Sequence, residues 1–287
     1  MDLDRWRQGG RTFSHRGHDV FYRDEGAGPV LLCIHGFPSA SWDWHKLWPA
    51  LTARFRVIAP DMLGFGLSAK PRPYAYSLRD QADLHAGLLT ALEIDRAHVL
   101  AHDYGDSVAQ ELLARQLDGT AAFRLLSVCL LNGGLFPERH RARPAQILLR
   151  SPLGPLLARL ANERRFAAGF AEVFGPGTQP SRDELHTVWL LNRHNDGLRV
   201  APKIIRYIDE RREQRERWVG ALQRTPVPLR FINGPEDPVS GRHMAERYRE
   251  LVPNPDVVLL EGIGHYPQLE APERVLDAFL SFIPASA

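Results

Sequence analysis

The sequence predicts an α/β fold in which a mostly parallel central sheet is flanked by helices and carries an inserted helical cap. Short apolar runs alternate with longer segments of helical period, which is typical of a parallel sheet covered on both faces. The alternation stops between residues 135 and 217, where Pro and Gly interrupt helical patterns. The 287 residues, 44% hydrophobic and 24% charged, fit one large globular core. We therefore expect a core formed by residues 1–134 and 218–287, with residues 135–217 as the cap.

Six short apolar runs are the expected strands, because buried parallel strands are rich in leucine and β-branched residues. They lie at residues 30–34, 55–59, 98–101, 127–132, 229–233 and 257–262. The clearest helix spans residues 77–93, where Ser77 and Asp80 form a capping arrangement. Its leucines recur on one face, at positions 84, 88 and 92.

Composition excludes several classes of protein. The net charge of +2 gives no reason to expect nucleic-acid binding, and no run approaches the roughly 18 apolar residues of a membrane span. The first ten residues lack the apolar centre of a secretory signal, while Cys33 and Cys129 lie inside apolar runs and are expected to be buried, reduced thiols. We expect a cytoplasmic monomer or homodimer. The densest charged run, residues 211–217, alternates acids and bases and is expected to be a solvated helix face.

The stretch HVLAHDYGDSVAQ, residues 98–110, predicts a nucleophile on a sharp strand-to-helix turn. Such a turn needs small residues two positions before and after the nucleophile, and Ala101 and Gly105 supply them around Asp103. A carboxylate there would attack an electrophilic sp3 carbon and form an ester. The spacing by itself also fits a purely structural tight turn, so the interpretation depends on partners elsewhere in the chain.

Those partners are an acid and a histidine, because the ester must be cleaved by an activated water. His265 follows the last predicted strand and Asp237 follows the one before it. The order Asp103, Asp237, His265 is the order nucleophile, acid, histidine. Taken singly, Asp237 could be a turn-forming residue before a proline, and His265 could be a polar loop residue. Three such residues at strand ends in this order favour a catalytic triad. Glu138 is the alternative acid.

The oxyanion of ester cleavage needs backbone donors. We expect one from Tyr104, which follows the nucleophile, and one from Phe37 in the loop after the first predicted strand. Pro38 fixes that loop either through a cis bond or through an ordinary turn.

Several motifs carry a resemblance to a known family: HGFP at 35–38, DMLGFGLS at 61–68 and GPEDPV at 234–239. With these the chain resembles the α/β-hydrolase superfamily, in its aspartate-nucleophile branch of epoxide hydrolases and haloalkane dehalogenases. A narrower likeness is to the mesoderm-specific transcript proteins, a hydrolase-like group. It rests on HDYGDSVAQELL at 102–113, NGGLFPERHR at 132–141, RWVGAL at 217–222 and HYPQLE at 265–270. The resemblance implies the triad and a helical cap.

Two positions depart from the dehalogenase pattern. Most dehalogenases and many epoxide hydrolases of the branch carry Trp after the nucleophile, where this chain has Tyr104, and many dehalogenases carry Asn in the oxyanion loop, where this chain has Phe37. Epoxide hydrolases instead use cap tyrosines, or a tyrosine with a histidine, to hydrogen-bond the epoxide oxygen. Tyr207 is the only tyrosine of the expected cap and lies beside an apolar stripe. His194 is the favoured second donor, with His186 as the other candidate.

Two further residues are candidates for substrate contact. Trp189 lies in the expected cap, where packing in the cap core is the simpler interpretation. His35 opens the HGFP motif of the oxyanion loop.

The preferred function is therefore hydrolysis of a small apolar epoxide with water to give a vicinal diol. The alternatives are a haloalkane dehalogenase, or a hydrolase-like binding protein without turnover, although all three triad residue types are present. A metallohydrolase is disfavoured because His15 and His18 form no ligand set with a carboxylate cluster. We expect no metal and no cofactor.

Overall fold

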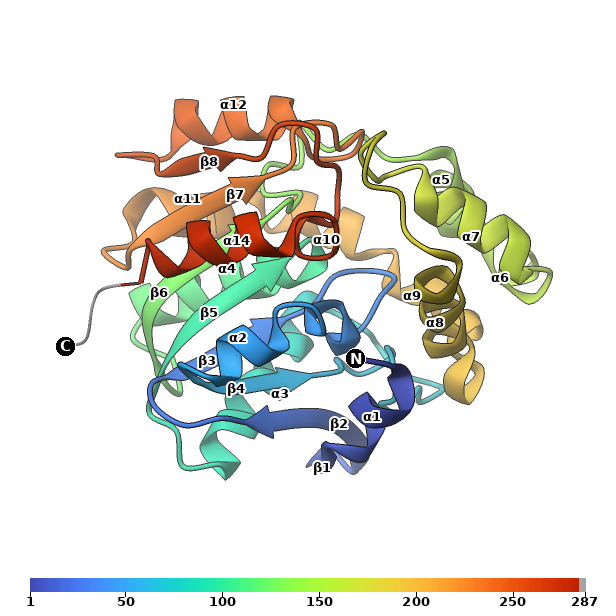
Figure 1. Ribbon diagram of the computed structural model, residues 1–287, viewed down its shortest axis with the longest axis horizontal. Helices are drawn as coiled ribbons and strands as arrows, with labels where there is room; N and C mark the ends of the chain where they lie inside the picture. The colour runs from blue at the N-terminus through green and yellow to red at the C-terminus, as the bar shows by residue number, and fades with distance from the viewer. Residues whose placement is uncertain (284–287) are drawn as a thin grey trace.

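The computed structural model describes residues 1–283 and is built around one eight-stranded sheet (Figure 1). The strand order is β1-β2-β4-β3-β5-β6-β7-β8. All pairs from β4 to β8 are parallel, whereas β2 is antiparallel to both β1 and β4. This sheet confirms the predicted fold class. Six of its strands match the expected runs: β3 (Val30–Ile34), β4 (Arg56–Pro60), β5 (Arg96–His102), β6 (Arg124–Leu131), β7 (Leu229–Asn233) and β8 (Val257–Leu259).

The first two strands, β1 (Gly10–His15) and β2 (His18–Glu25), form an antiparallel hairpin that the apolar pattern does not predict. β1 is the edge strand, and His15 is its one buried side chain, so it offers no apolar run. Arg16 and Gly17 close the hairpin with φ angles of 50° and 78°. Positive φ at both positions is what a two-residue hairpin turn requires. Gly17 is therefore the sequence feature that could have predicted the hairpin.

Helices cover both faces of the sheet, as the side chains of β3 show. Leu32 and Ile34 pack with residues of α3 (Leu78–Ala91), α4 (Tyr104–Leu117), α11 (Arg215–Arg224) and α12 (Arg242–Leu251). Leu31 and Cys33 point the other way and pack with α1 (Leu3–Gln8), α2 (Trp48–Thr52) and α14 (Pro272–Leu280). This alternation is the two-residue period of a strand buried on both sides. Cys33 and Cys129 are buried free thiols.

Residues 135–217 contain no strand, and most of their helices lie beyond the carboxyl ends of the parallel strands (Figure 1). We call residues 144–213 the helical segment. The predicted boundary after residue 217 falls inside α11, which packs on α4 of the core. The segment comprises α5 (Pro144–Arg150), α6 (Gly154–Arg159), α7 (Glu163–Ala171), α8 (Arg182–Arg193), the 3₁₀ turn His194–Arg199, α9 (Ala201–Ile204) and α10 (Tyr207–Glu213).

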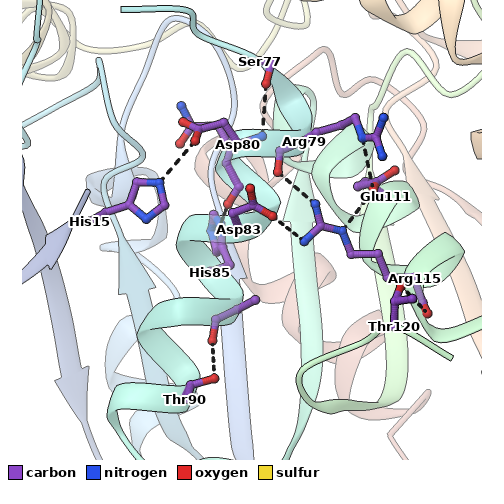
Figure 2. Close-up of polar contacts among 12 residues, drawn as sticks. His15, Ser77, Arg79, Asp80, Asp83, His85, Thr90, Glu111, Arg115 and Thr120 are labelled. Carbon is purple, nitrogen blue, oxygen red and sulfur yellow. Dashed lines mark hydrogen bonds and ion pairs between the residues drawn. The ribbon is translucent and has the colours of Figure 1, made fainter.

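Polar contacts join α3 to α4 (Figure 2). Ser77 Oγ accepts from the Asp80 N–H at 3.1 Å, the predicted helix cap. Arg115 on α4 donates to Asp83 on α3 at 2.7 Å and to Glu111 at 3.0 Å. Burial alone would raise the pKa of Glu111, but hydrogen bonds from Arg217, Trp218 and Arg115 outweigh it and hold that pKa below its usual range. Glu111 is therefore a buried anion that ties α11 to α4.

Replacement of Glu111 by Gln is expected to lower the free energy of unfolding by about 2 kcal/mol, because the buried carboxylate loses charged hydrogen bonds from Arg115 and Arg217. The measurement is urea unfolding at pH 7. Asp118→Asn is the matched control, since Asp118 also pairs with Arg217 but its side chain is 47% exposed, and exposed pairs contribute about 1 kcal/mol or less. Equal losses in the two variants would contradict the assigned role of Glu111.

Candidate active site

Asp103 lies on the turn between β5 and α4 in a strained conformation. Its φ is 48° and its ψ is −102°, in a region that favours glycine and costs a non-glycine residue on the order of 1–3 kcal/mol. The turn packs tightly, because a Cβ at Gly105 would lie 2.4 Å from the backbone oxygen of Ile34. A hydrogen bond of 3.1 Å from the Asp103 N–H to the Leu131 carbonyl holds the turn against β6.

The carboxylate of Asp103 is only 3% exposed and has two neighbours that favour its charged form. The Phe37 N–H donates to Oδ2 at 3.1 Å, and the Arg211 guanidinium lies 3.5 Å from Oδ1. Burial by itself would raise the pKa of Asp103, but the charge of Arg211, helped by His265, lowers it below the usual range. A buried, ionised carboxylate with one oxygen held by a backbone donor has the properties of a nucleophile.

His265 and Asp237 lie where the triad prediction requires them to meet. His265 Nδ1–H donates to Asp237 Oδ2 at 2.7 Å. Asn132 and Ser240 also donate to that oxygen, at 2.9 and 2.8 Å, and fix the carboxylate. Burial would lower the pKa of His265, but the charge and hydrogen bond of Asp237, with the charge of Asp103, raise it to about 9. Against the opposing effect of burial, the same contacts lower the pKa of Asp237 to about 2.

His102, the residue before Asp103, contacts the loop that carries His265. Its Nε2 lies 2.7 Å from the backbone oxygen of His265, to which it donates. Burial lowers the pKa of His102 to about 3, so the ring is neutral at pH 7.

Of the two expected oxyanion donors, Phe37 contacts the Asp103 carboxylate and Tyr104 follows Asp103 in the chain. Phe37 makes the contact described above, and the Phe37–Pro38 bond is cis. Tyr104 is the first residue of α4, a position whose backbone N–H has no acceptor inside the helix. His35 has a structural environment: its Nδ1 lies 2.9 Å from the Gly36 carbonyl and its Nε2 accepts from the Met62 N–H at 3.0 Å.

Tyr207 is the one aromatic candidate of the helical segment that reaches these residues within the described chain. Its ring centre lies 4.9 Å from that of Tyr104 and 5.9 Å from that of Phe37. The side chain is buried, and its hydroxyl has no hydrogen-bond partner among residues 1–283. Burial raises the pKa of Tyr207, so the phenol stays protonated. The hydroxyl is thus available to a bound molecule.

The structure places the other candidates elsewhere in the helical segment. His186 is exposed and pairs with Glu163 at 2.6 Å, and Trp189 packs on Phe166 at 5.4 Å between ring centres. His194 is half-buried at the end of α8. No hydrogen bond or ring contact joins His194 or Trp189 to the predicted triad within the described residues.

The expectation that residues 211–217 form a solvated helix face is wrong at its first residue. Arg211 is 2% exposed, donates to the Asp103 carbonyl at 2.8 Å and to Ser107 Oγ at 2.6 Å, and stacks over the Tyr207 ring. The sequence feature that could have predicted this burial was spacing, because Tyr207 and Arg211 are four residues apart and share one face of α10.

His140 is a second residue that sequence reasoning missed. Both of its ring nitrogens are shielded from solvent and have no partner among the described residues. A Cβ at Gly134 would lie 2.4 Å from Nη1 of Arg211 and 3.1 Å from Nδ1 of His140, so both side chains border that glycine. Burial, with the nearby charge of Arg211, lowers the pKa of His140 to about 3.

The sheet order, the turn after β5 and the loops after β7 and β8 define the α/β-hydrolase class of fold. The chain belongs to the α/β hydrolase family, whose model, described as "Alpha/beta hydrolase family", matches residues 31–278.

Relatives agree with that membership and confirm the predicted resemblance to the mesoderm-specific transcript proteins. The chain is 44% identical to the mesoderm-specific transcript protein of Mus musculus, over 98% of this chain and 88% of that one. It is 44% identical to the hydrolase LipZ of Mycobacterium tuberculosis, over 97% and 96%. Epoxide hydrolase A of the same species is more distant, with 29% identity over 90% and 91% of the two chains.

Solved structures share the fold at low sequence identity. The epoxide hydrolase CorEH has a TM-score of 0.79 at 22% identity, over 95% of this chain and 97% of that one. The haloalkane dehalogenase DatA from Agrobacterium tumefaciens C58 has a TM-score of 0.79 at 20% identity, over 95% and 96%.

Proposed function

We propose that this α/β hydrolase opens small apolar epoxides with Asp103 as the nucleophile and hydrolyses the resulting ester to a vicinal diol. The observation that carries the proposal is the buried Tyr207 hydroxyl, without a partner among the described residues, beside an ionised carboxylate on a strained turn. The distant likeness to proteins named epoxide hydrolase supports it. The helical segment would act as the cap that covers the substrate.

In the first step, Oδ1 of Asp103 attacks a ring carbon while the carbon–oxygen bond of the epoxide breaks. The electron pair goes to the ring oxygen, and this alkoxide takes the proton of the Tyr207 hydroxyl. An alkoxide is more basic than a phenolate, so the transfer is favourable even though burial raises the pKa of Tyr207.

In the second step, water attacks the ester carbonyl and gives a proton to His265. The oxyanion forms on Oδ2, which the Phe37 N–H already contacts at 3.1 Å, with Tyr104 as the second backbone donor. Collapse of the intermediate releases the diol oxygen, which recovers the proton from His265. The regenerated Asp103 loses the remaining proton of water, and this replaces the one that Tyr207 gave.

The charge of Asp103 sets when His265 can act as a base. In the free enzyme Asp237 and Asp103 raise the pKa of His265 to about 9, so the imidazole is protonated at pH 7. Ester formation removes the charge of Asp103, and the pKa of His265 must fall. The imidazole then loses its proton to solvent, so the neutral ring is available as the base for the ester hydrolysis that follows, and a proton returns to it when the charge of Asp103 is restored.

Tyr207→Phe is expected to lower the rate of ester formation from an epoxide by about 100-fold or more, because the alkoxide loses its proton donor. Ester hydrolysis should keep its parental rate. Rapid-quench single-turnover measurements separate the two steps. Tyr248→Phe is the matched control, since Tyr248 is also buried with an unpartnered hydroxyl among the described residues, but lies on α12 against Phe231.

An unchanged rate of ester formation in Tyr207→Phe would show that Tyr207 is not the proton donor. If the parent enzyme also released halide from bromoalkanes, haloalkane dehalogenation would replace epoxide opening. If it formed no covalent adduct with either class of substrate, a binding protein without turnover would be the better description.

A further inference from the structure

The outer helices of the helical segment expose a group of large aliphatic side chains. Five side chains on α5, on α6 and beside them are 47% to 62% exposed, and they are five of the eight exposed large hydrophobic residues of the described chain. Soluble monomers rarely expose contiguous apolar patches, and those that do mostly use them for binding. We call this group the α5–α6 patch: Ile147, Leu148, Leu153, Leu156 and Leu160.

The patch is held in place by the fold. α5 packs on α6, and both pack on α9. The connection between α5 and α6 is tight, because a Cβ at Gly154 would lie 1.9 Å from the Leu149 carbonyl oxygen. Ala158 lies on the inner face of α6 and is buried, so the exposed leucines lie on the outer face of a packed helix. Figure 1 shows α5 and α6 at the outer edge of the molecule, away from the sheet.

Arginines are concentrated in the same stretch of the sequence as the patch, and two of them are paired, Arg143 with Glu172 and Arg150 with Asp209. Residues 143–165 contain five arginines and one glutamate, a net charge of +4, although the whole chain carries only +2. The rest of the chain is therefore net negative. Arg159, Arg164 and Arg165 are exposed and form no ion pair with any residue from 1 to 283, while Glu163 pairs with His186.

We propose that the α5–α6 patch docks the protein on the surface of an anionic lipid bilayer. The aliphatic side chains would enter the boundary between headgroups and acyl chains, and the arginines would contact lipid phosphates. A second copy of the chain fits less well, because a two-fold interface would place the same arginines against one another. This docking is peripheral, since no helix of the described chain is long and apolar enough to cross a membrane. The proposal does not depend on the reaction assigned to Asp103.

The test is sedimentation of the full chain with large unilamellar vesicles of phosphatidylcholine alone or with one-quarter phosphatidylglycerol. The parent is expected to bind the anionic vesicles and to release them in 0.5 M salt, because exposed charges are screened. The variant Leu153→Ser/Leu156→Ser/Leu160→Ser should lose at least about tenfold in partition coefficient, since each exposed leucine contributes burial energy. Arg159→Gln/Arg164→Gln/Arg165→Gln should also lose at least about tenfold, because each arginine near an anionic surface contributes to the attraction.

Leu117→Ser/Leu190→Ser is the matched control, because both leucines are exposed but lie outside the patch, and it should bind like the parent. Failure of the parent to bind anionic vesicles, or equal binding by the patch and control variants, would overturn the proposal. Binding that is equal on neutral vesicles would remove the role of the arginines. A parental dimer in gel filtration that the leucine variant converts to monomer would assign the patch to a second copy instead.

Discussion

Asp103→Ala is expected to abolish hydrolysis, with a loss of at least about 10,000-fold in kcat/KM, because the ester has no other atom on which to form. The fold should survive at a cost in stability, since the Cβ of the turn is kept but the buried Arg211 guanidinium loses its counter-charge. The measurement is turnover of an epoxide that the parent hydrolyses, with thermal unfolding recorded on the same samples. Asp103→Asn is a weaker test, because a neighbouring base can slowly hydrolyse the amide back to the acid.

Asp106 offers the matched control for this experiment. It lies one turn further along α4 and is equally buried, but burial and the nearby charge of Asp103 raise its pKa well above the usual range. Because burial favours the uncharged form of Asp106, Asp106→Asn, which is uncharged and has the same shape, should keep most of the activity. Near-parental turnover in Asp103→Ala, or an equal loss in both variants, would remove Asp103 from the role of nucleophile.

His265→Ala is expected to separate the two chemical steps. Removal of a general base typically costs about 100-fold to 10,000-fold, and here the cost should fall on ester hydrolysis. The variant should therefore be alkylated once at Asp103 and then stall. Intact mass identifies the chemistry, because an adduct from an epoxide retains the whole molecule, whereas an adduct from a haloalkane lacks the halogen. Peptide mapping that places the adduct on another residue would contradict the assignment.

The acid partner of His265 can be tested in the same assay. Glu138, the alternative to Asp237, is bound by Arg215 at 2.9 Å and by Arg247 at 3.2 Å, and its hydrogen bonds lower its pKa to about 2. Both arginines hold the carboxylate of Glu138 at the surface, so it is not the hydrogen-bond partner of His265. Asp237→Ala should consequently stall at the ester as His265→Ala does, and Glu138→Ala should turn over like the parent.

The sequence predicts the parallel strands because burial on both faces leaves a continuous apolar run. It does not predict the β1–β2 hairpin, because an edge strand with one buried side chain leaves no such run. The same reasoning explains the candidate site. Asp103, Asp237 and His265 follow predicted strands, so the topology of a parallel sheet brings their loops to one edge.

The donors from the helical segment were harder to predict. Short helices broken by Pro and Gly have a register that pattern alone does not fix, and α8 ends at a kink where Asn195 and Asp196 have positive φ. His194 sits at that kink, so its direction could not be read from the period of α8. The burial of Tyr207 could be predicted, because an apolar stripe beside it in the sequence marks the buried face. Arg211 shares this face, but the alternating charges after it concealed its burial.

Because Arg211 contacts Asp103, the helical segment and the core that carries the β5–α4 turn do not function as separate modules. The Asp103 carboxylate comes from the turn after β5, whereas the Arg211 guanidinium that favours its charged form comes from α10, more than a hundred positions later in the sequence. Any exchange of the helical segment between relatives, by recombination or in a designed chimaera, would therefore alter the acidity of Asp103 together with the side chains that surround it. Under the proposed function, such an exchange would change the reactivity of the carboxylate as well as its contacts with the substrate.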